Sequence, residues 1–233
     1  PYTDTERYKT LLYSAEHLAL ARQAAIQSTV LLQNTGHLLP LASGKRRIAV
    51  IGPFVRERAT LLGSWSPDGD VEDTQTLLDA LREAAPQARI ETISNTLTDE
   101  MLMEVRLSEL VILTVGESNA RNGEFNSIAS LDLPAGQEEL VRAVHAMGKP
   151  IVLVVLAGRP VTLARIAPLV SAILFAWHPG SAGAAAIADI IFGKAVPGGK
   201  LPVSYPRSEG QVPVHYNHNS TGKPFARYLD MPV

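Results

Sequence analysis

One stretch of the chain decides its fold class: Leu110–Glu117, which reads LVILTVGE. The run is almost entirely apolar and ends in Gly116 and Glu117, a pattern that predicts a strand buried on both faces. A long polar loop follows and carries a second carboxylate at Glu124. Because ligands bind outside the carboxyl ends of the strands in open α/β sheets, the two glutamates form a candidate acid/base site. The loop by itself also fits two solvated carboxylates without any chemistry, which is the commoner situation for surface glutamates.

Apolar runs of strand length alternate with segments of helical spacing along most of the chain. The expected strands are residues 45–52, 89–93, 110–116, 150–157, 171–177 and 200–205. The expected helices are residues 10–34, 76–84, 98–107, 135–147, 161–166 and 181–192. This order predicts an α/β protein with a doubly wound, mostly parallel sheet flanked by helices on both faces. We expect residues 1–206 to form this one domain and residues 207–233 to form an extended tail that leads toward a further domain.

Composition narrows the class of protein. The 233 residues carry a formal net charge of −2 and no long basic run, which disfavours a nucleic-acid partner. The hydrophobic fraction of 46% suffices for a substantial core, and no apolar run reaches the roughly 18 residues that suggest a membrane span. Without cysteine, disulfides and thiolate metal sites are excluded. The chain starts at Pro1 without a signal peptide and both ends look cut, so we expect a piece of a longer polypeptide.

Doubly wound sheets often bind nucleotides, so a flavodoxin-like nucleotide binder is one alternative. The first expected strand is followed by Gly52 and Pro53, with neither a G-x-G-x-x-G nor a phosphate-loop lysine, and the proline lacks the N–H that a phosphate would use. Residues 193–200 (GKAVPGGK) stand between a helix and a strand, the wrong order for a phosphate loop, and predict a turn. His215 and His218 have no partner carboxylate nearby in sequence and are expected to be exposed loop histidines. We therefore expect no cofactor and no metal.

Eight separated motifs, in a fixed order and with sensible spacing, resemble a known family. They are STVLLQN at 28–34 with LLPL at 38–41, IAVIGP at 48–53, GSWS at 63–66, GE at 116–117 with Glu124, LDLPAGQ at 131–137, GKP at 148–150 with GRP at 158–160, W-x-x-G-x-x-G-x-x-A-x-A-D at 177–189, and G-x-x-x-P-x-G-K-L-P-x-x-x-P at 193–206. Together they resemble the C-terminal domain of glycoside hydrolase family 3, in particular of its bacterial periplasmic β-glucosidases. The resemblance covers nearly the whole chain.

This resemblance implies a six-stranded α/β sandwich packed beside a (β/α)8 barrel of the same polypeptide. In the family the barrel supplies the nucleophilic aspartate, and this sequence contains neither the barrel nor the S-D-W or T-D-W motif of that nucleophile. The implied function is that of one domain of a retaining β-glycosidase, expected to be a periplasmic or secreted β-glucosidase that hydrolyses terminal β-linked sugars. The isolated chain is then expected to be inactive. The alternative from another class is a non-catalytic carbohydrate-binding or scaffolding module.

The resemblance also assigns roles to particular residues. Glu124 is the predicted general acid/base, and Glu117 is its rival, with a loop-bracing carboxylate as the other interpretation of Glu117. Trp65 is predicted to line the aglycone side of the substrate site, because the apolar face of a sugar packs well on an aromatic ring; core or interdomain packing is its alternative role. Arg159 is a candidate structural partner for a carboxylate, and Trp177 is expected to be structural.

Overall fold

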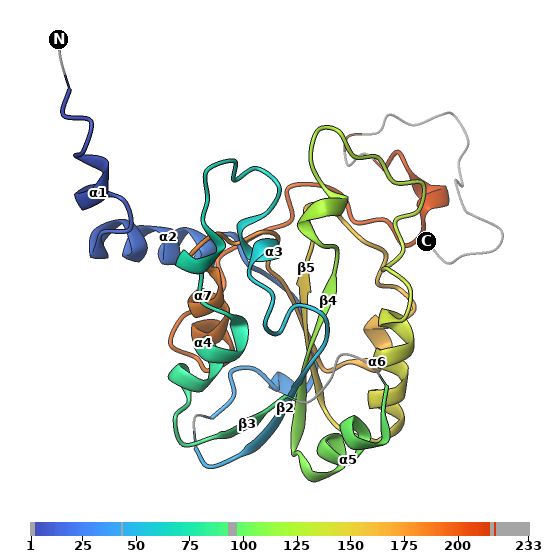
Figure 1. Cartoon of the computed structure of the whole chain (residues 1–233). Helices are drawn as coiled ribbons and strands as arrows, with labels where there is room; N and C mark the ends of the chain where they lie inside the picture. The colour runs from blue at the N-terminus through green and yellow to red at the C-terminus, as the bar shows by residue number, and fades with distance from the viewer. Residues whose placement is uncertain (1–2, 43, 93–96, 215–216, 218–233) are drawn as a thin grey trace.

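The computed structural model describes residues 3–42, 44–92, 97–214 and 217. Within them the chain forms a six-stranded sheet in the order β1-β6-β5-β4-β2-β3, with helices on both faces (Figure 1). The strands are β1 (Val30–Asn34), β2 (Arg47–Ile51), β3 (Arg89–Glu91), β4 (Leu110–Gly116), β5 (Ile151–Leu156) and β6 (Ala172–Phe175). Neighbouring strands are parallel except for β1 and β6, which are antiparallel. The expected α/β class, with a mostly parallel six-stranded sheet between helices, is confirmed.

Helices lie on both faces of the sheet. The described helices are α1 (Tyr8–Leu11), α2 (Ala15–Ser28), α3 (Ala59–Leu62), α4 (Leu77–Ala84), α5 (Asp99–Leu107), α6 (Gln137–Ala146) and α7 (Gly183–Ile191). Helix α1 buries none of its residues and extends away from the sheet (Figure 1). Helices α4 and α7 pack on one face, and α5 and α6 on the other (Figure 1). Successive strand residues point to opposite faces, so in β4 Ile112 joins the first layer and Leu113 the second. Both side chains are fully buried, which explains why this strand is apolar throughout.

The start of the chain differs from expectation. We expected one helix over residues 10–34, but residues 12–14 interrupt it, α2 runs only from Ala15 to Ser28, and the following VLLQN segment forms β1. Thr29 already has extended backbone angles, and Val30 pairs with Phe175 across the antiparallel ladder. A short apolar run of this kind fits either a helix or a strand, and here its pairing with β6 decides for the strand.

Two further segments also differ. Residues 200–205 were expected to form an edge strand, but they form no strand, and β1 occupies that edge of the sheet beside β6. The chain just before them is held against α2 and β1 instead, because the N–H of Gly199 donates to the carbonyl of Thr29 at 3.0 Å. Residues 161–166 were expected to be helical, but Thr162 makes a single parallel bridge to Asp132 and the segment turns into a 3₁₀ helix further on.

The boundary predicted at residue 206 stays a prediction. Of the expected tail, the structure describes residues 207–214 and 217, so His215 and His218 lie outside the described residues. Within the described ranges, no helix combines the length and the apolarity that crossing a membrane requires.

Candidate active site

The site begins where β4 comes very close to β5. Gly116 ends β4 with φ +135°, and a Cβ placed on it would lie 1.8 Å from the carbonyl oxygen of Leu156. Gln137, at the start of α6, holds the same residue from the other side: its amide donates to the Gly116 carbonyl at 2.9 Å and accepts from the Gly116 N–H at 2.7 Å. The N–H of Glu117 donates to the Leu156 carbonyl at 2.8 Å. The chain therefore leaves the sheet along a fixed path.

Glu117 does not face solvent. Its side chain is 0% exposed and forms ion pairs with Arg121 (Oε1 to Nε, 3.2 Å) and Arg159 (Oε2 to Nε, 3.0 Å). A buried carboxylate needs such partners, because charge removed from water is otherwise strongly unfavourable. The sequence pointed to Arg159 as a structural partner for a carboxylate, and the structure brings it to Glu117.

Hydrogen bonds from side chains to backbone carbonyls fix the shape of the loop after Glu117. The amide of Asn122 donates to the Ser118 carbonyl at 3.1 Å, and the amide of Asn126 donates to the Asn122 carbonyl at 2.8 Å. Glu124 lies between these two asparagines with its side chain exposed. Among the described residues its carboxylate has no hydrogen-bonding or ion-pair partner, so it is free to interact with a ligand.

Glu124 lines an open groove of about 640 Å³ at the carboxyl edge of the sheet. The residues that line it are Ser64, Trp65, Asn122, Gly123, Glu124, Asn126, Gly158, Arg159 and His178. Trp65 is 73% exposed, so its ring is not part of the domain's core. Glu124 is the one carboxylate in this described lining, whereas hydrolysis with retention needs two carboxyl groups about 5 Å apart. The groove can therefore supply a proton-transfer group and an aromatic wall, but not the second carboxylate.

His178 was not singled out by the sequence, yet it joins the two loops of the groove. It follows β6 and lies between Gly63 and Gly158: a Cβ on Gly63 would meet its ring at 2.8 Å, and one on Gly158 would meet its Nε2 at 2.9 Å. Its Nδ1 is 2.6 Å from the carbonyl oxygen of Thr60, which can only accept, so the proton is on Nδ1 and Nε2 is left as an acceptor. The signal that could have found it is its place directly after Trp177, at the end of a buried strand.

Burial lowers the pKa of His178 below its usual value. Three interactions oppose this shift: the hydrogen bond to Thr60 and the charges of Glu117 and Glu57. His178 Nε2 is buried and has no hydrogen-bond partner within the described part of the chain. At pH 7 His178 is therefore uncharged, and its ring fills the space between Gly63 and Gly158 in the groove lining.

Trp177 has a different role from Trp65. Its ring packs edge-on against Phe175 with centroids 4.3 Å apart, and Phe175 packs against Tyr205 in the same manner at 5.7 Å. Burial raises the pKa of Tyr205, whose hydroxyl accepts a hydrogen bond from the N–H of Val161. These rings pack at the end of β6, a structural role for Trp177.

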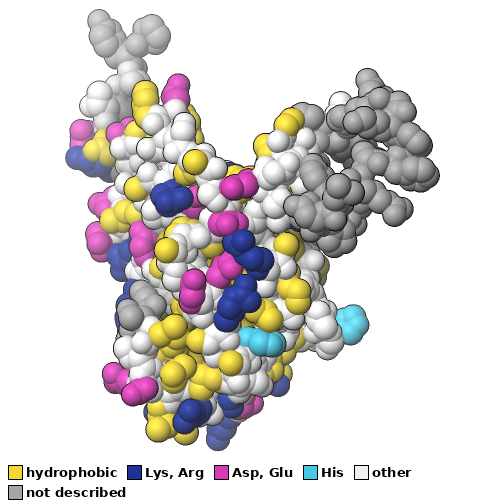
Figure 2. Space-filling model, turned by 90° about the vertical axis from the view of Figure 1, so that its right-hand side faces the viewer, with side chains coloured by type: hydrophobic (Ala, Val, Ile, Leu, Met, Phe, Trp, Pro, Cys, Tyr) yellow, Lys and Arg dark blue, Asp and Glu magenta, His cyan; other side chains and the backbone are white. Residues whose placement is uncertain are grey.

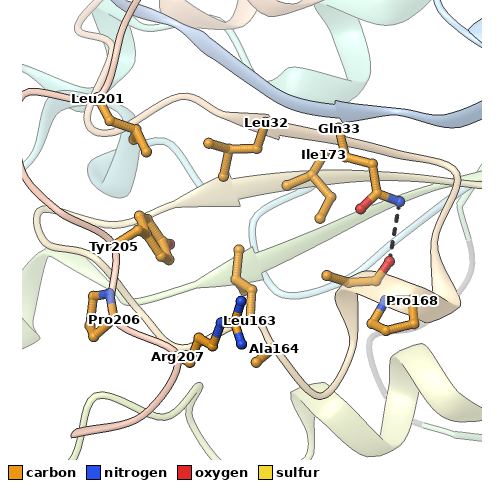
Figure 3. Close-up of a pocket in the computed structure, with 11 residues that line it drawn as sticks. Leu32, Gln33, Leu163, Ala164, Pro168, Ile173, Leu201, Tyr205, Pro206 and Arg207 are labelled. Atoms are coloured by element: carbon orange, nitrogen blue, oxygen red, sulfur yellow. Dashed lines mark hydrogen bonds between the residues drawn. The ribbon is translucent and has the colours of Figure 1, made fainter. Parts of the chain in front are cut away.

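A second cavity, of about 560 Å³, lies beside β1 and β6. The side chains of Leu32 and Ile173 face those of Leu163 and Tyr205 across it (Figure 3). The residues described around it are mostly apolar and include no carboxylate. Nor do the described residues anywhere bring together three side chains of the types that bind a metal ion.

Fold and groove together define an α/β domain that presents one carboxylate and one aromatic ring at the carboxyl edge of its sheet. Residues 29–230 match the model of the glycosyl hydrolase family 3 C-terminal domain, and the chain belongs to this family. The resemblance that the sequence motifs indicated is thereby confirmed.

The chain is also similar to individual glycosidases. The chain is 34% identical to a periplasmic β-glucosidase of Salmonella typhimurium, across 90% of this chain and 31% of that protein. It is 36% identical to a β-xylosidase of Formosa agariphila, across 91% of this chain and 31% of that protein. The crystal structure of a β-glucosidase from Listeria innocua in complex with isofagomine superimposes with a TM-score of 0.91 at 33% identity, across 99% of this chain and 34% of that one. The chain thus spans about a third of the length of these relatives.

Proposed function

We propose that this chain is the acid/base-bearing domain of a retaining β-glycosidase, with Glu124 as the general acid/base. The observation that carries the proposal is the contrast between two glutamates of one loop. Glu124 is exposed, lies in the groove and has no ion-pair partner among the described residues, whereas Glu117 is fully buried between two arginines. A proton-transfer group must reach the substrate oxygen to within hydrogen-bond distance, which the burial of Glu117 prevents.

In this mechanism Glu124 acts twice. It first protonates the glycosidic oxygen as the bond to the leaving group breaks, and the sugar passes to the nucleophile. It then removes a proton from the water that releases the sugar from the covalent intermediate. Trp65 lines the same groove and offers an exposed ring on which the aglycone can pack.

The nucleophile is proposed to come from a (β/α)8 barrel in the same polypeptide. Two findings support this partner: the described groove lining has a single carboxylate, and the relatives are about three times as long as this chain. The proposed substrate is a terminal β-linked glucoside, since β-glucosidases occur among both the similar sequences and the similar structures. A periplasmic or secreted location is proposed from the periplasmic relative.

The alternative is a carbohydrate-binding or scaffolding module without catalysis. The exposed Trp65 would serve such a module equally well. The two functions differ in what they require of Glu124, because a binding module has no need of a titratable group on a closed loop.

The test is Glu124→Gln in the full-length polypeptide that carries this chain. Hydrolysis of a disaccharide, whose leaving group needs a proton, should fall by about 10²–10⁴-fold, the range for loss of a general acid. Formation of the covalent intermediate from a dinitrophenyl β-glucoside should slow far less, and azide should restore turnover because it attacks without a general base. Glu138→Gln is the matched control, since Glu138 lies on α6 outside the groove lining.

The outcomes separate the candidates. Azide rescue in Glu117→Gln and not in Glu124→Gln would assign the acid/base to Glu117. Full activity of Glu124→Gln on disaccharides would leave the binding module as the function.

A further inference from the structure

Glu117 is unusual because it is a fully buried carboxylate at the edge of an active-site groove, with no access to the groove itself. Burying a charge is unfavourable, and a buried ion pair is often no more stabilising than apolar side chains of the same size. Within the described part of the chain, its Oε2 accepts no hydrogen bond and has Arg159 as its ion-pair partner. Stability by itself is therefore a weak reason for this arrangement.

The contacts of Arg159 show what the ion pair does. Arg159 follows β5, and its guanidinium reaches three points of the neighbouring loop: Glu117 (3.0 Å), the carbonyl of Arg121 (2.6 Å) and the side chain of Asn122 (3.3 Å). Arg121 in turn pairs with the other oxygen of Glu117 at 3.2 Å. Both ends of the segment from Glu117 to Asn122 are thus bound by the guanidinium of Arg159.

Glu124 lies only two residues beyond Asn122. The side-chain amide of Asn126 donates to the Asn122 carbonyl at 2.8 Å, so one hydrogen bond connects the chain on either side of Glu124. A displacement of Arg159 or Glu117 would therefore be passed to Glu124. Proton transfer is sensitive to such displacement, because a shift of about 1 Å can reduce a rate about 10²-fold.

We propose that Glu117, through its ion pair with Arg159, is a positioning residue that sets where the carboxylate of Glu124 lies in the groove. The inference rests on the proposed function of Glu124. It deepens that function by naming the buried ion pair on which acid/base catalysis depends.

A second carboxylate with two arginine partners offers a comparison. Glu138 on α6 pairs with Arg142 (3.3 Å) and Arg165 (3.0 Å), and Arg165 also pairs with Asp132 (2.8 Å). Figure 2 shows acidic and basic side chains gathered across the middle of the face that carries α6. None of these four residues lines the groove. Glu138 is therefore a control: it is an ion-paired carboxylate that makes no hydrogen bond or ion pair with the described loop of Glu124.

The experiment is a double-mutant cycle of Glu117→Gln and Glu124→Gln in the full-length polypeptide. Glutamine keeps the size of Glu117 and removes its charge. Glu117→Gln should lower kcat/KM for a disaccharide by about ten- to a hundredfold. It should affect a dinitrophenyl β-glucoside much less, and azide should not rescue it because the Glu124 carboxylate is still present. In the Glu124→Gln background the same change should have no further effect, since its action passes through Glu124.

Other results would overturn the inference. An equal loss for all leaving groups, or the same loss with and without the Glu124 carboxylate, would make Glu117 a structural residue only. If Glu117→Gln does not fold, Arg159→Lys decides in its place, because lysine keeps the charge but not the planar guanidinium; only a loss selective for poor leaving groups supports the inference. Glu138→Gln should match the wild type throughout. Absence of leaving-group dependence in Glu124→Gln itself would refute the proposed function instead.

Discussion

Replacing Gly116 by alanine should strongly destabilise this domain, because the end of β4 has no room for a Cβ. The added atom would lie 1.8 Å from the carbonyl oxygen and 2.6 Å from the carbonyl carbon of Leu156. Both are backbone atoms of β5, so the strands would have to separate at the edge where the groove is built. The same carbonyl accepts the hydrogen bond from the Glu117 N–H, which would be lost with the separation.

The expected cost has three parts. A non-glycine residue in this backbone region costs about 1–3 kcal/mol. Overpacking against β5 adds about 1–3 kcal/mol, and the lost hydrogen bond about 1 kcal/mol. The free energy of unfolding should therefore fall by about 3–7 kcal/mol, a large part of the 5–15 kcal/mol typical of a domain.

Gly136→Ala is the matched control. Gly136 also has a positive φ (+85°), but a Cβ there would meet nothing within 4 Å. Its substitution should cost only about 1–2 kcal/mol, the backbone contribution alone. Urea unfolding of the two variants, followed by circular dichroism, gives the difference directly. Equal destabilisation by the two substitutions would refute the close approach of β4 to β5.

Two further predictions concern the groove. Trp65→Ala should change the free energy of unfolding by less than about 0.5 kcal/mol, because the ring is 73% exposed. In the full-length polypeptide it should raise KM for disaccharides. A loss of about 2 kcal/mol or more in the free energy of unfolding would indicate core packing instead. His178→Asn should weaken the pH dependence of the free energy of unfolding below neutrality. Because the pKa of His178 is lower in the folded protein than its usual value of 6.5, protonation favours the unfolded chain. The wild type therefore has its full stability above pH 6.5 and loses part of it as the pH falls toward the folded pKa. Asparagine can still donate to Thr60 but does not titrate, so equal pH dependence of wild type and variant in urea titrations would contradict the shift.

The central strands could be predicted from the sequence because burial on both faces leaves a local signature. β4 and β5 are fully buried along their length, and both are continuous apolar runs. β1 has no such signature: beyond Val30 its residues are partly exposed, and the helical spacing of the residues before it extends into the strand. Residues 200–205 show the opposite case: this Pro-containing segment was expected to be an edge strand, but it pairs with no strand.

Parts of the site also follow from sequence alone. Its place in a polar loop after a buried strand made Glu124 a candidate, since ligands bind at that edge of the sheet. The family resemblance made Trp65 a candidate. Loop position alone could not separate Glu124 from Glu117, because their spacing says nothing about burial; the preference for Glu124 came from the family resemblance. His178 was missed although it directly follows Trp177 at the end of a buried strand, because its place between Gly63 and Gly158 depends on three segments far apart in the chain.

Local patterns of apolar residues, glycines and prolines were enough to predict the α/β class, the central buried strands and the family. The difference in exposure between Glu117 and Glu124 depends instead on the tertiary structure. Arg159 is 42 residues from Glu117 in sequence, and the two meet only because β4 and β5 lie side by side in the sheet. That meeting removes Glu117 from solvent and leaves Glu124 exposed in the groove beside Trp65.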